Sequence, residues 1–174
     1  MFNRIRKRLF LIAGMAVLTC TASIQAQAPA HAVDFSFRAI DGPPVTAESV
    51  RGEVAVLAFG ASWLPLTRNQ MEAVKKLADQ YAGRGVAVYW VSTESDSAKS
   101  KNFASDDQLR ELGRKYKVSI LRDADGVAAK RLGVDQLPSV LIINKQGNIA
   151  EAIGGMDPNA NLGKDLAGRL EKVL

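Results

Sequence analysis

The stretch that decides the fold is "VAVLAFGASWLPLTRNQM", residues 54–71. It opens with a continuous apolar run of strand length, the pattern of a strand that is covered on both faces. It then passes through Trp63 and Pro65 into a helical pattern, because apolar residues recur at helical spacing as far as Tyr81. A second apolar run, "GVAVYWVS" at residues 85–92, follows this helix. A strand, helix, strand unit of this length is a right-handed crossover, so we expect two parallel central strands.

The flanking segments predict further strands and helices around this unit. "DFSFRAI" alternates Phe35 and Phe37 with polar residues, as a half-buried strand does. "SDDQ" at residues 105–108 has the form of a capping box, so a helix should begin there and end near Tyr116. The rest of the chain predicts a short strand, a short helix, a hairpin and a last helix, at residues 118–121, 127–133, 139–153 and 157–174. We expect one α/β domain over residues 33–174, with a central mixed β-sheet flanked by helices.

The first 32 residues have the form of a secretory signal peptide. Four basic residues and no acid precede an apolar run at residues 9–22, and small residues follow it. The run is shorter than the roughly 20 residues that a membrane span needs. We therefore expect cleavage after Ala32 and export to the periplasm, with an uncleaved membrane anchor through residues 9–22 as the alternative. Lipidation of Cys20 is a third possibility, which Thr19 disfavours because a smaller residue usually precedes such a cysteine.

Charge and composition exclude several classes of function. The chain carries a formal net charge of +5, and the four basic residues near its start account for most of it, which leaves 5 − 4 = +1 for residues 33–174. The basic balance is therefore an export signal, and we expect no nucleic-acid partner. The single cysteine, Cys20, lies in the apolar run, and the single histidine, His31, precedes the expected domain. We expect no disulfide within the chain, no metal site and no other cofactor.

Two long segments together resemble the thioredoxin superfamily, and within it the exported TlpA/ResA-like thiol-disulfide oxidoreductases and their redoxin neighbours. The segments are "DFSFRAIDGPPVTAESVRGEVAVLAFGASW" and "DADGVAAKRLGVDQLPSVLIINKQGNI". The resemblance implies a thioredoxin-like fold and a cis peptide bond before Pro138. Family members carry a C-x-x-C motif directly after the tryptophan, where this chain has Leu64 and Thr67 in place of the cysteines. Some members also keep a buried acid on the central strand, where this chain has Ala58.

These departures separate the implied fold from the implied activity. Disulfide exchange needs a thiolate with a lowered pKa and a second thiol, and neither Leu64 nor Thr67 supplies one. We expect the Thr67 hydroxyl to bond to a backbone N–H at the start of the helix. The sequence therefore predicts that no catalytic residue is present, although a thiol-disulfide oxidoreductase, or an adaptor in a redox or cytochrome-assembly system, remains the alternative that the family suggests.

The remaining parts of the family's site predict a surface for binding polypeptide. The cis-proline of the family leaves backbone groups of the preceding residue free to pair with an extended chain, and an apolar patch would lie beside it. The predicted binding residues are Trp63, Leu64, Pro65, Leu66, Thr67, Leu137 and Pro138. The expected partner is a periplasmic protein or an extended peptide. In the competing interpretation, Trp63 packs under the helix start and Pro138 serves only the fold.

Overall fold

The two apolar runs form the centre of the sheet, as predicted. In a computed structural model that describes residues 32–155, 157 and 160–174, β3 (Val54–Gly60) and β4 (Val86–Ser92) pair in parallel, with Val54 opposite Val86. Helix α1 (Thr67–Gln80) makes the crossover between them. Every residue of β3 is buried, because the sheet is covered on both faces.

Five shorter strands complete one mixed sheet in the order β2-β1-β5-β4-β3-β6-β7. They are β1 (Ser36–Ala39), β2 (Val45–Thr46), β5 (Ile120–Arg122), β6 (Ser139–Ile143) and β7 (Ile149–Gly154). The remaining helices are α2 (Asp106–Tyr116), the 3-10 turn η1 (Ala124–Gly126), α3 (Val127–Arg131) and α4 (Leu162–Leu170). The pairs β3–β6 and β6–β7 are antiparallel, which confirms the predicted hairpin.

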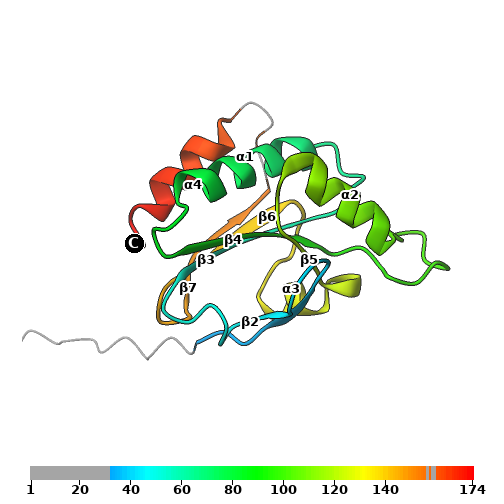
Figure 1. Ribbon diagram of the computed structural model, residues 1–174, viewed down its shortest axis with the longest axis horizontal. Coiled ribbons are helices and arrows are strands. Elements are labelled where there is room, and N and C mark those ends of the chain that lie inside the picture. The colour runs from blue at the N-terminus through cyan, green and yellow to red at the C-terminus, as the bar shows by residue number, and fades with distance from the viewer. Residues whose placement is uncertain (1–31, 156, 158–159) are drawn as a thin grey trace, which may run out of the picture.

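Helices cover both faces of this sheet. Figure 1 shows α1, α2 and α4 on one face and α3 on the other. Because side chains of a strand alternate between faces, Val56 and Ala58 of β3 pack under the three helices, whereas Leu57 and Phe59 face the opposite core. Phe37 of β1 and Ala129 of α3 belong to that second core.

The boundaries differ from the expectations at a few positions. Helix α1 begins at Thr67 and the strand expected from residue 118 begins at Ile120, while β2 had not been predicted. The capping box of α2 is present, since Ser105 and Gln108 each accept a hydrogen bond from the backbone of the other. The predictions for the signal peptide, for Cys20 and for the anchor at residues 9–22 concern residues outside the described part. Among the described residues, no helix has the length and apolar character needed to cross a membrane.

Candidate functional site

A tight turn links β3 to α1 and carries most of the predicted binding residues. The N–H of Leu64 donates to the carbonyl of Ala61, and the N–H of Thr67 donates to the carbonyl of Leu64. The Thr67 side chain is buried, and its hydroxyl donates to the Ala61 carbonyl at 2.5 Å. The expectation that this hydroxyl bonds to a backbone N–H is therefore wrong, because the loop turns back far enough to bring a carbonyl into its reach.

A buried carboxylate lies under this turn. Glu94, just after β4, is 1% exposed, and it accepts hydrogen bonds from the Ser62 N–H at 3.0 Å and the Ser62 hydroxyl at 2.6 Å. The hydroxyl of Ser92 donates to it at 3.0 Å. A buried charge is tolerated only with such partners, so Glu94 fixes the start of the turn to the end of β4. The sequence analysis missed Glu94, whose only signal is an acid directly after a buried parallel strand.

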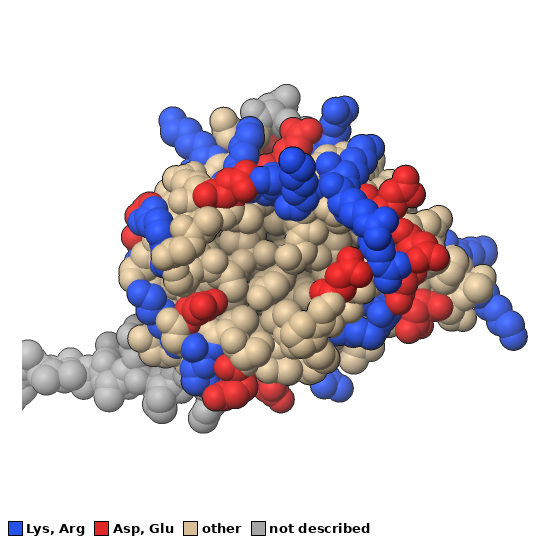
Figure 2. Space-filling model, viewed as in Figure 1, with Lys and Arg blue, Asp and Glu red and all other residues tan. Residues whose placement is uncertain are grey.

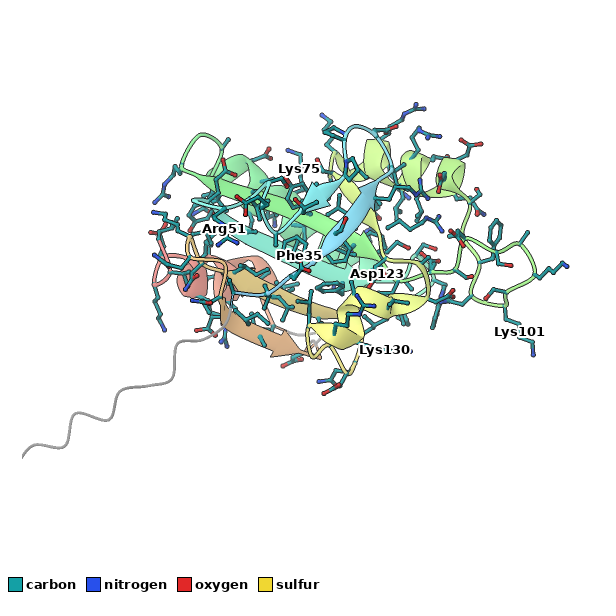
Figure 3. The ribbon with its side chains drawn as sticks, turned by 90° about the horizontal axis from the view of Figure 1, so that it is seen from below. Phe35, Arg51, Lys75, Lys101, Asp123 and Lys130 are labelled. Atoms are coloured by element: carbon teal, nitrogen blue, oxygen red, sulfur yellow. The ribbon has the colours of Figure 1, made fainter. Side chains whose placement is uncertain are left out.

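Trp63 lies on the surface at the outer side of the turn. Its side chain is 65% exposed, and its indole N–H donates to the side-chain oxygen of Asn102 at 2.8 Å. Asn102 lies in the long loop between β4 and α2, whose far end carries Lys101 and projects from the body of the protein in Figure 3. The exposed ring excludes the interpretation in which Trp63 packs under the helix start. One hydrogen bond thus holds a large apolar surface in contact with solvent.

Leu137 and Pro138 form the opposite side of the site. The peptide bond between them is cis, Leu137 is 36% exposed and Pro138 is buried. Among the residues that the structure describes, the backbone N–H and C=O of Leu137 have no hydrogen-bond partner. These groups are available to an extended chain that lies alongside.

A hollow of about 470 Å³, here called the turn groove, runs between the two sides. Trp63, Leu64 and Leu137 line it among the predicted residues. The structure does not bring Pro65, Leu66, Thr67 or Pro138 into its lining. Pro65 is exposed and Leu66 half-buried on the turn, whereas Thr67 and Pro138 are buried. The other residues of the lining come from the loop after β4 and from the region of α3: Thr93, Asn102, Asp125, Gly126, Ala129, Lys130, Val134, Asp135 and Gln136.

Helix α3, whose first N–H groups bond to Asp123, forms the third side of the turn groove. Asp123 is buried, and its two carboxylate oxygens accept the N–H groups of Ala128 and Ala129 at 2.9 and 2.7 Å. Figure 3 shows Asp123 beside α3 and Lys130 on the same helix. No cluster of acidic, cysteine or histidine side chains suited to a metal ion occurs within the described ranges.

A second buried hydrogen-bond network supports the floor of the site. Gln70 of α1 donates to the carbonyls of Phe59 and Ser139, both at 3.1 Å, and accepts the indole N–H of Trp90 at 2.8 Å. These bonds tie α1, β3, β6 and β4 together at the end of the sheet where the turn lies. Gln70 was expected only as part of a helix, and nothing in its local sequence distinguishes it.

Comparisons with a family model and with individual relatives point to the same family. A model of the AhpC/TSA family matches residues 27–152. The thiol:disulfide interchange protein DsbE of Pseudomonas aeruginosa is 29% identical over 155 residues, which are 85% of this chain and 81% of that protein. The thiol-disulfide oxidoreductase ResA of Bacillus anthracis is 24% identical over 143 residues, which are 82% of this chain and 76% of ResA.

Solved structures share the fold. The exposed lipoprotein thioredoxin Etrx1 of Streptococcus pneumoniae superposes with a TM-score of 0.62 at 22% identity, covering 80% of this chain and 99% of that one. A secreted disulfide oxidoreductase of Mycobacterium tuberculosis superposes with a TM-score of 0.63 at 21% identity, and the superposition covers 79% of this chain and 95% of that one. The chain therefore belongs to the AhpC/TSA family of thioredoxin-like proteins, as a member of the DsbE and ResA type with a single cysteine, Cys20.

Proposed function

We propose that this protein is exported and binds extended polypeptide in the turn groove without exchanging disulfides. The single observation that carries the proposal is the combination found at the groove. The exposed Trp63 is held in place opposite the unpaired backbone of Leu137, and Leu64, which the family resemblance places at the first cysteine position, lines the groove beside them. Thiol exchange requires a thiolate, and the chain has no cysteine after Cys20.

The lining supports a partner of mixed polarity in extended conformation. Trp63, Leu64 and Leu137 offer apolar contact to alternate side chains of a bound strand, and the Leu137 backbone offers it a donor and an acceptor. Asp125 and Lys130, on the third side, suit polar or charged side chains of the same segment. The names of the relatives support export, because one is a secreted oxidoreductase and another an exposed lipoprotein.

Binding is tested with arrays of overlapping peptides probed with the purified full chain and two groove variants. Leu137→Glu places a charge among apolar contacts, and Asn102→Ala releases the Trp63 ring. Each should weaken peptide binding by about tenfold or more, which corresponds to about 1.4 kcal/mol. Val127→Glu is the matched control, because Val127 is an exposed aliphatic residue of α3 outside the groove lining. Equal peptide binding by all four proteins would remove the turn groove as the binding site.

The proposed lack of disulfide exchange needs a separate assay. Insulin reduction by a Cys20→Ser full chain should not exceed the uncatalysed rate, because no thiol remains to attack a disulfide. Sustained turnover by that variant would instead favour the thiol:disulfide interchange activity that the relatives' names describe.

A further inference from the structure

The charged residues of the turn groove all lie on its third side. Asp125 and Lys130 come from η1 and α3, Asp135 comes from the segment that follows α3, and all three are exposed. None of them makes an ion pair with the described residues. The other two sides, which carry Trp63 and Leu137, are largely apolar. The free charges of the groove therefore face an aromatic and aliphatic surface.

Two buried carboxylates add to the negative charge of this region. Glu94 follows Thr93 of the lining along the chain, and Asp123 bonds to the first N–H groups of α3, which forms the third side. With the two aspartates and the one lysine of the lining, the groove and its support carry a formal charge of 1 − 4 = −3. The buried cation Arg122 does not line the groove and lies 3.2 Å from Asp106 of α2. The local charge is therefore strongly negative.

The sign of this local charge is opposite to that of the whole chain. The full chain carries a formal net charge of +5, and residues 33–174 carry +1. On the face seen in Figure 2, acidic side chains are mixed with basic ones around an uncharged centre. Lys101 lies at the far end of the projecting loop in Figure 3. A preference of the groove for cations would thus come from its own residues and not from the overall charge.

Trp63 supplies the second feature that a basic side chain requires. Its indole N–H is bound to Asn102 at 2.8 Å, which fixes the ring, and 65% of the side chain is exposed. An ammonium or guanidinium group over the face of an indole is attracted by the ring electrons. Carboxylates across the groove attract the same cation. Arginine satisfies both at once, because its flat guanidinium stacks on a ring while its N–H groups pair with a carboxylate.

We propose that the turn groove selects extended segments that carry a basic side chain, arginine above all, placed between the Trp63 ring and the carboxylates of Asp125 and Asp135. This inference rests on the proposed function, because it names the class of polypeptide that the groove takes. Lys130, the one cation among the lining residues that the structure describes, opposes the preference. Its removal should therefore strengthen the selection of basic segments.

Fluorescence anisotropy with three labelled peptides tests this selection. The peptides share a sequence of alternating serine and valine and differ only at the central residue, which is arginine, glutamine or glutamate. The full chain should bind the arginine peptide about fivefold or more tightly than the glutamine peptide, and the glutamate peptide most weakly. Non-specific attraction to a chain of net charge +5 would give the reverse order.

Variants at exposed positions assign the preference to the groove. Asp125→Asn combined with Asp135→Asn should remove most of the difference between the arginine and glutamine peptides. Asparagine also suits the left-handed backbone at position 125, where φ is 61°. Lys130→Gln should enlarge the difference. Glu53→Gln combined with Glu111→Gln is the matched control, because it removes two exposed carboxylates outside the groove lining and should leave the difference unchanged.

The outcomes separate this inference from the proposed function. Equal affinities for the three peptides, with binding that Asn102→Ala still weakens, would overturn the charge selection and leave the groove as a polypeptide site. A preference for arginine that survives the loss of both Asp125 and Asp135, or that the control variant abolishes as well, would also overturn it. Failure of all three peptides to bind, or binding that Asn102→Ala leaves unchanged, would overturn the proposed function and this inference together.

Discussion

Removal of the Glu94 carboxylate should loosen the turn that presents Trp63. Glu94 is buried and accepts three hydrogen bonds, two from Ser62 and one from Ser92. In Glu94→Ala, the buried hydroxyl of Ser92 and the N–H of Ser62 lose their acceptor. In Glu94→Gln, one amide oxygen remains to accept from Ser62, and the Ser92 hydroxyl can turn to accept from the amide.

The size of the effect follows from opposing contributions. A hydrogen bond to a charged group contributes about 1.5–3 kcal/mol, so three such bonds would stabilise the fold by roughly 4.5–9 kcal/mol. Burial of an unpaired carboxylate costs several kcal/mol in return. Ser62 is exposed, so water replaces part of what its hydroxyl loses. We therefore expect Glu94→Ala to lower the free energy of unfolding by about 2–3 kcal/mol, and Glu94→Gln by about 1 kcal/mol.

Two measurements separate the global and local parts of this effect. Urea unfolding followed by circular dichroism gives the free energy of unfolding, and acrylamide quenching of tryptophan fluorescence reports the freedom of Trp63. Glu111→Ala is the control, because Glu111 is exposed on α2 and its loss should change stability by no more than about 0.5 kcal/mol. If Glu94→Ala unfolds at the same urea concentration as Glu111→Ala, the network under the turn contributes nothing and the reasoning fails.

Two further predictions concern the cysteine positions and the acid stability. Leu64→Cys combined with Thr67→Cys should form a disulfide detectable by mass spectrometry and should reduce insulin. The reason is that the turn brings the N–H of residue 67 within 3.1 Å of the carbonyl of residue 64. A double variant that stays fully reduced under an oxidant would show that the local geometry has diverged. Asp106→Asn should lower the free energy of unfolding by about 1–3 kcal/mol, since it leaves the buried Arg122 guanidinium, 3.2 Å away, without a carboxylate. The hydrogen bond from Arg38 holds the pKa of Asp106 below its usual value of 3.8, so this contribution is complete above that pH and disappears as the pH falls through the lower, folded-state pKa. Urea unfolding at neutral and acidic pH should therefore show the parent and the variant converging in acid, and a constant difference would contradict the assignment.

Local sequence patterns were enough to predict the main helices and strands of the fold. The apolar runs at residues 54–59 and 86–92 became the central parallel strands, because an uninterrupted run of that length is stable only where both faces are covered. The Ser105 capping box also appeared as expected, since it involves residues only three apart. The absence of sulfur at positions 64 and 67 is equally a property of the sequence.

The predicted site was only partly recovered, for a geometric reason. Trp63, Leu64 and Leu137 line the turn groove, whereas Thr67 turns into the core and bonds to a carbonyl. Whether a residue of a tight turn points inward or outward depends on the backbone angles of the whole turn. Residue type and spacing do not specify these angles.

The sequence by itself determined that this chain forms an α/β sandwich without paired thiols, because apolar periodicity and residue identity are local quantities, and the resemblance of two long segments to the thioredoxin superfamily gave the type of fold. Only the tertiary structure decided how the site is held and which surfaces stay open. Glu94 meets Ser62 across 32 residues and Asn102 meets Trp63 across 39. The short β5 leaves part of β4 unpaired, and that depends on where two distant segments stop running side by side. Such contacts are set by the packing of the sheet and its helices, which no short window of sequence contains.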